Sequence, residues 1–187
     1  MNTPRTLAVV TATAAALTAG ASAATATASG SDPKKVTIKG SARMYYAPDP
    51  KDDVRFTLDA TATYTELGQD PMPATAGGTF KVSHRVDSLN ITVWAEARVD
   101  CVRASGRVAT VTAVVYKTSP ELQRDWMGRR LGFTIADFGR KNDQMGSIGP
   151  REEVARCLKG TPYVAPAPFS LAQRGGFTLK HDLPPMP

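Results

Sequence analysis

The sequence predicts an all-β protein, an antiparallel β-barrel of about eight strands. After residue 35, most of the chain alternates apolar and polar side chains, which is typical of strands with one face in water. Turn-forming stretches separate these runs, and helical periodicity is nearly absent. A sheet with one wet face has to curl over a single core. A closed barrel is therefore favoured, with a two-layer sandwich as the second choice.

The clearest alternation lies in four runs, residues 36–46, 54–65, 77–86 and 91–101. In each run one phase carries mainly aliphatic, aromatic or small residues, and the other carries mainly charged residues, Thr or Ser. We expect the first phase to face the core. His84 and Cys101 both fall on that inward phase.

The following strands are less regular. Residues 107–117 are apolar on both phases, so the sequence leaves their facing open. A polar stretch, 118–130, leads to another alternating run at 131–139. Shorter runs at 145–149 and 175–180 complete the expected barrel.

One short helix is expected between the last two runs, over residues 150–158. Pro150 stands at its start, Glu152 and Glu153 lie in its first turn, and Gly160 follows its end. These are the usual start and stop signals of a helix.

The first residues have the composition of a secretory signal peptide. Arg5 precedes a run of small and apolar residues, and Ala21-Ser22-Ala23 fits the small-residue rule for cleavage between Ala23 and Ala24. A membrane anchor is the alternative, but a span needs roughly 20 strongly apolar residues and this run is shorter and rich in Ala and Thr. The sequence therefore predicts a secreted, extracellular protein without a membrane span in its mature form. The expected organisation is a signal peptide (1–23), a flexible leader (24–35) and a single barrel domain (36–187).

The charge distribution argues against nucleic acid as a specific partner. The chain carries a formal charge of +6, and loss of Arg5 with the signal lowers it to about +5. The basic residues are spread along the chain rather than clustered as in a nucleic-acid stripe. Loose attraction to anionic wall polymers or lipid stays open.

Only two cysteines occur, Cys101 and Cys157. In an oxidising, exported setting we expect them to form one disulfide, worth on the order of 4 kcal/mol. We expect this bond to tether the short helix to the barrel end opposite His84. Two cysteines and two distant histidines have no ligand spacing, so neither a metal nor a cofactor is expected.

Several stretches resemble a known family. They are GTFKVSHRV, VDCVRASGRVATVTAVV, GFTIADFGR and, near the end, APAP followed by GGFTL. Together they are similar to the repetin-like secreted proteins of actinobacteria, with a longer segment here between MGSIG and APAP. The resemblance covers most of the chain after the signal. It implies an exported single-domain β protein and, because that family has no established activity, no particular reaction.

One rim of the expected barrel is the candidate site. If neighbouring strands alternate in direction, this rim collects Tyr45, Tyr46, Asp52, Asp53, His84, Tyr116, Trp126, Arg129 and Arg130. A mouth with aromatic and a few polar side chains is where small barrels bind ligands. It is also where any barrel keeps amphipathic residues whose polar ends reach water.

The leading functional prediction is a non-enzymatic binding module whose partner is an unknown small ligand, a cell-wall polymer or a protein. The alternative is a small barrel enzyme that acts at the mouth near His84. A general base needs an orienting carboxylate, and the sequence places Asp137 at the opposite end and Asp100 on the outward phase. A structural role for His84 is therefore favoured. Trp94 and Trp126 are candidates for sugar or protein contact, or for packing under the Pro-rich connection.

Overall fold

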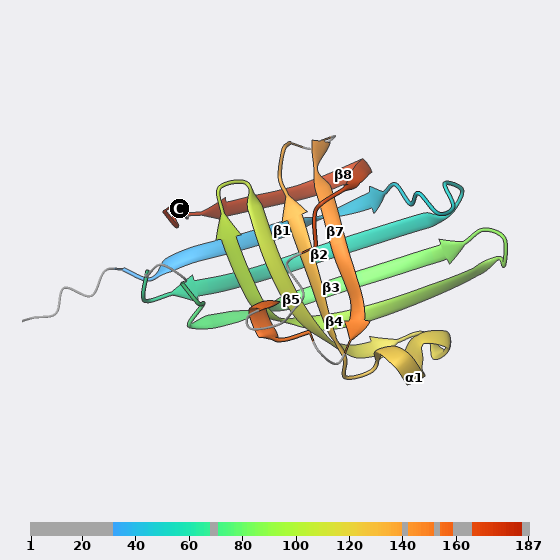
Figure 1. Cartoon of the computed structure of the whole chain (residues 1–187), viewed down its shortest axis with the longest axis horizontal. Helices are drawn as coiled ribbons and strands as arrows, with labels where there is room; N and C mark the ends of the chain where they lie inside the picture. The colour runs from blue at the N-terminus through green and yellow to red at the C-terminus, as the bar shows by residue number, and fades with distance from the viewer. Residues whose placement is uncertain (1–31, 68–70, 140–141, 152–153, 159–165, 185–187) are drawn as a thin grey trace, which may run out of the picture. The chain divides into compact units, whose positions relative to one another are not determined.

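The structure is a computed structural model that describes residues 32–67, 71–139, 142–151, 154–158 and 166–184. In these segments eight antiparallel strands form a closed barrel, with each strand paired to its neighbours in chain order and the last returning to the first (Figure 1). The predicted barrel is confirmed, and the alternative, a two-layer sandwich, does not form. The strands are β1 (Lys34–Met44), β2 (Asp53–Tyr64), β3 (Thr75–Val86), β4 (Ile91–Ser105), β5 (Val108–Thr118), β6 (Arg130–Ala136), β7 (Gln144–Arg151) and β8 (Ser170–His181). The expected signal peptide lies outside the described residues.

The core follows the alternation of the first strands. Ile38, Leu58 and Phe80 lie on the inward phases of β1, β2 and β3 and have almost no exposed surface. Phe80 stacks on Phe56 of β2 at 5.7 Å and on Phe133 of β6 at 4.3 Å between ring centroids. These three rings connect opposite parts of the barrel wall through its interior. They bury large apolar surfaces, the main favourable contribution to folding.

A glycine lets two neighbouring strands, β3 and β2, approach each other closely. Gly78 has φ +128°, and a Cβ there would lie 2.1 Å from the carbonyl oxygen of Asp59 on β2. Only glycine permits that approach of β3 to β2, since any side chain would collide with backbone.

Closure between β7 and β8 depends on two carboxylates. The ladder between these strands pairs only Gln144 with Leu171 and Met145 with Ser170. Further along β8, the N–H of Phe177 donates to Asp143 Oδ2 at 2.7 Å and the N–H of Leu179 donates to Asp137 Oδ2 at 2.9 Å. Side-chain oxygens thus replace the missing strand partners of β8.

A β-bulge in β4 overturns one expectation, the inward position of Cys101. The pairing of β4 with β5 shifts register between Val99 and Cys101. The extra residue reverses the phase, so Val102 and Ala104 join the core cluster and Cys101 does not. Cys101 is nonetheless fully buried because another segment covers it from outside the barrel.

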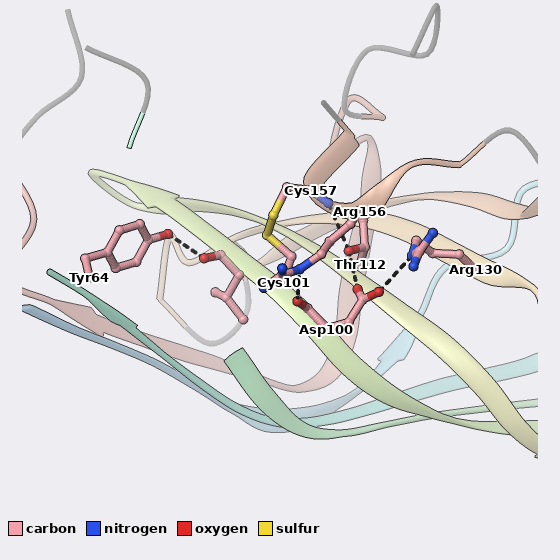
Figure 2. Close-up of a disulfide and its surroundings, with 8 residues drawn as sticks. Tyr64, Asp100, Cys101, Thr112, Arg130, Arg156 and Cys157 are labelled. Atoms are coloured by element: carbon pink, nitrogen blue, oxygen red, sulfur yellow. Dashed lines mark hydrogen bonds and ion pairs between the residues drawn. A yellow bond between two sulfur atoms is a disulfide. The ribbon is translucent and has the colours of Figure 1, made fainter. Parts of the chain in front are cut away.

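That covering segment carries the disulfide partner. Cys101 and Cys157 are bonded, with 5.3 Å between their Cα atoms, which confirms the predicted disulfide. Figure 2 shows Cys157 beside Thr112, whose Oγ1 accepts the N–H of Cys157 at 3.2 Å and donates to Asp100 Oδ1 at 2.5 Å. The expected tether to the barrel end opposite His84 is wrong, because the bond fixes residues 154–158 to the outer wall of β4 and β5.

Two arginines complete this outer-wall network (Figure 2). Arg130 of β6 donates through Nε to Asp100 Oδ2 at 2.8 Å and through Nη1 to the carbonyl of Val154 at 3.1 Å. Arg156 donates through Nε to the carbonyl of Asp100 at 2.8 Å. Asp100 therefore links β5, β6 and the segment of Cys157 through hydrogen bonds around the disulfide.

The prediction of a helix over 150–158 is wrong: no α-helix forms in the residues of that range that the structure describes. β7 continues to Arg151, which pairs with Arg130 of β6, and only the 3-10 turn η3 (Arg156–Leu158) follows. A helix this short is marginal by itself, so strand pairing overrides its start signals. The described α-helix is instead α1 (Gln123–Trp126), preceded by the 3-10 turn η1 (Pro120–Leu122), in the stretch expected to be a polar loop. Within the described residues, no helix has the length and apolar character needed to cross a membrane.

Candidate ligand-binding cavity

One mouth of the barrel opens into a cavity of about 600 Å³. Phe56, Phe80 and Phe133, the stacked rings of the core, also line it. Aliphatic residues from β2, β3, β4 and β6 form much of its wall, among them Val54, Val82, Val93 and Leu131. The lining is therefore chiefly apolar, with a few polar groups near the opening.

The best-defined polar group is a histidine held by a buried carboxylate. His84 Nε2 lies 2.5 Å from Asp52 Oδ2, and the N–H of Asp87 donates to Asp52 Oδ1 at 2.8 Å. The side chain of Asp52 is 3% exposed, against 25% for His84. The Asp87 N–H and then the His84 ring stabilise the carboxylate and hold the pKa of Asp52 below its ordinary value of 3.8.

Strand register explains why these residues meet. His84 pairs with Val54 across β2 and β3. Asp52 lies directly before β2 on the same phase as Val54, so it reaches the histidine diagonally across the sheet. The ring of His84 also meets Tyr46 edge to face, with 4.9 Å between centroids. The histidine is thus held by a hydrogen bond on one side and an aromatic contact on another.

The cavity brings together part of the predicted rim. Tyr45, Tyr46, His84 and Trp126 all line it. Trp126 lies in α1 and packs on the core cluster, so α1 covers part of the mouth. The ligand-binding role predicted for these four residues stays a prediction.

The other predicted rim residues lie elsewhere. Tyr116 is on the outer wall, where its hydroxyl donates to Glu96 Oε2 at 2.8 Å and Arg98 stacks 4.8 Å from its ring centroid. Arg130 belongs to the outer-wall network around Asp100. Arg129 joins β5 through its backbone and is not part of the cavity lining. Asp53 pairs with Arg55 and Arg43 rather than with the histidine.

The sequence missed the pairing of Asp52 with His84. Its signal was present, since Asp52, Val54 and His84 share the inward phase of neighbouring strands. Finding it needed the register between β2 and β3, and the long linker between these strands does not fix register as a two-residue hairpin would. Asp100 and Asp137 were not expected to pair with His84, and they form other hydrogen bonds. Asp100 accepts from Arg130 Nε, and Asp137 accepts from the N–H of Leu179.

The arrangement supplies a proton acceptor beside a hydrophobic space. Among the described residues, no group of three or more His, Cys, Asp or Glu side chains is placed to hold a metal ion. Ser147 and Ser170 also line the cavity, but neither forms a hydrogen bond with His84. The geometry therefore shows an oriented imidazole without an activated serine beside it.

Fold and site together define an eight-stranded antiparallel barrel with a small, mostly apolar cavity at one mouth. Comparison with protein-family models, with curated proteins and with solved structures found no match. The resemblance to repetin-like proteins accordingly stays a prediction.

Proposed function

We propose that this chain is an exported binding protein that takes a small, mainly apolar ligand into the cavity at the barrel mouth. The cavity carries the proposal. Its volume of about 600 Å³ falls in the range of small-molecule sites, and its walls are apolar with a few polar groups. An eight-stranded barrel is also just large enough to hold one small ligand.

Exposed apolar side chains around the opening support the same proposal. Tyr45 and Phe169 line the cavity, yet they are 43% and 77% exposed. Leu171 is 49% exposed and accepts the N–H of Tyr45 through its carbonyl, which places it beside the opening. Grouped apolar exposure of this kind marks binding surfaces.

The test compares two tryptophan substitutions on one strand. Val93 of β4 lines the cavity, whereas its neighbour Thr92 is exposed on the outer face. The uncharged fluorophore N-phenyl-1-naphthylamine should bind the protein saturably, with enhanced emission. Val93→Trp should fill the cavity and weaken binding about tenfold or more, and Thr92→Trp should leave it unchanged. Absence of saturable binding, or equal binding by two folded variants, contradicts the proposal.

A second candidate function, a small barrel enzyme, is favoured by one observation, the contact between His84 and Asp52. A carboxylate-oriented histidine at a cavity is the usual arrangement of a general base. A native mass spectrum of protein purified from culture medium would look for a retained molecule. If that molecule stays chemically unchanged after long incubation with the protein, binding alone accounts for the site. Its conversion by the wild type but not by His84→Phe supports the enzyme.

A further inference from the structure

The hydrogen bonds around His84 fix which of its ring nitrogens carries a proton. Asp52 Oδ1 is occupied by the N–H of Asp87, and Oδ2 faces His84 Nε2. An ionised carboxylate only accepts hydrogen bonds, so Nε2 must be the protonated nitrogen. In a neutral imidazole the other nitrogen, Nδ1, then carries a lone pair and can only accept.

The lone pair on Nδ1 is available to accept a hydrogen bond from a ligand. No described residue donates a hydrogen bond to His84 Nδ1, while the His84 side chain lines the cavity and is 25% exposed. Around the ring, Tyr46, Val54 and Val82 offer mostly apolar surface. A ligand that enters without a donor would strip water from Nδ1 and leave it unpaired, which lowers affinity.

We infer that the ligand pairs an apolar, ring-sized body with a hydroxyl or N–H group that donates a hydrogen bond to His84 Nδ1. The chemical class is a phenol or an amphipathic alcohol. This inference rests on the proposed function, because it names the polar group of a ligand bound in that same cavity. Asp52 acts as a positioning residue, since it sets the tautomer of His84 without touching the ligand.

The experiment compares two probes that differ in one donor, 2-naphthol and 2-methoxynaphthalene. Calorimetric titration should show 2-naphthol binding about tenfold more tightly than 2-methoxynaphthalene. His84→Phe should bind both probes with similar affinity. That result would separate the hydrogen bond from the apolar contribution of the cavity.

Asp52→Asn gives a readout that a merely structural role would not produce. The Asn oxygen can still accept the Asp87 N–H, which turns its NH₂ group towards His84 Nε2. The histidine must then accept at Nε2 and carry its proton on Nδ1. The preference for 2-naphthol should then be lost, because the oxygen of either probe can accept a hydrogen bond from Nδ1. Asp53→Asn is the matched control, because Asp53 pairs with Arg43 and Arg55 and should keep the wild-type preference.

The outcomes separate this inference from the proposed function. If neither probe binds the wild type, the proposed function fails and the inference fails with it. If both bind equally, the cavity is a binding site but His84 does not select a donor. A folded Asp52→Asn that still prefers 2-naphthol overturns the tautomer argument. Should Asp52→Asn not fold, as judged by circular dichroism, the His84→Phe comparison decides, and a preference retained there overturns the inference.

Discussion

Asp143 Oδ2 accepts the backbone N–H of Phe177 at 2.7 Å, and this contact joins the residue before β7 to β8. The other oxygen, Oδ1, accepts the N–H groups of Phe138 at 3.0 Å and Gly139 at 2.9 Å. Asp143 has no exposed surface. One carboxylate therefore satisfies three backbone donors at the place where the strand ladder is shortest, and it holds the barrel closed.

Asp143→Ala should destabilise the fold by about 3 to 5 kcal/mol, because it leaves buried N–H groups without an acceptor. Urea unfolding followed by tryptophan fluorescence measures the loss. Asn142→Ala is the control, since Asn142 is the exposed neighbour. An equal, small effect for both variants would show that closure does not depend on this carboxylate.

The stability contributed by Asp52 should depend on pH with a defined sign. Its pKa in the folded protein is lower than the ordinary 3.8, chiefly because of the Asp87 N–H and then His84. The unfolded state therefore binds protons first as pH falls. The contribution is complete above 3.8 and is lost as pH drops through the lower, folded value. Unfolding midpoints measured from about pH 7 to about pH 2 should show the wild type losing its advantage over Asp52→Asn in acid. A constant difference across that range would contradict the assignment.

Export predicts a defined amino terminus. If residues 1–23 are a signal peptide, the protein recovered from culture medium should begin at or near Ala24. It should also contain no free thiol, in keeping with the disulfide between Cys101 and Cys157. Edman sequencing and thiol labelling check both statements. Secreted material that still begins with Met1 would refute the signal peptide.

Alternation predicted the facing of the first strands because each of them has one wet side. Ile38, Leu58 and Phe80 lie in the core as their phases require. The same rule failed at Cys101, because a bulge adds one residue to β4 and reverses which face of the sheet the following residues occupy. A bulge of this kind leaves no composition signal in a single sequence.

Long-range pairing accounts for the other differences. The sequence around Pro150 has helix start signals, but β7 pairs with β6 up to Arg151 instead. Local helix propensity cannot predict this long-range pairing. Of the candidate site, the sequence supplied His84 and its aromatic neighbours. It did not supply the bond to Asp52, because that contact depends on the register of two strands joined by a long linker.

Replacing Cys101 and Cys157 together by alanine should cost roughly 2 to 5 kcal/mol. The bond holds residues 154–158 on the outer wall, so hydrogen exchange should rise there before it rises in β1. Thr112→Val is the control that removes the hydrogen bonds of Oγ1 and keeps the disulfide, and its loss should be smaller. Unchanged protection at 154–158, with β1 opening first, would show that the tether does not stabilise this segment.

Tyr64 should make the fold sensitive to alkali. Its hydroxyl donates to the carbonyl of Val102 at 2.5 Å inside the barrel (Figure 2), and burial raises the pKa of Tyr64 to about 12 from 10.0. Because the unfolded phenol loses its proton first, the contribution is complete below 10.0 and falls as pH rises to about 12. Tyr64→Phe should cost about 1 to 2 kcal/mol at neutral pH, since the Val102 carbonyl loses its donor. It should also flatten the alkaline loss of stability and leave the remaining tyrosines to titrate as before. Absorbance titration near the tyrosinate band, combined with urea unfolding, measures both effects. A wild-type titration in which every tyrosine ionises near pH 10.0 would contradict the buried hydrogen bond.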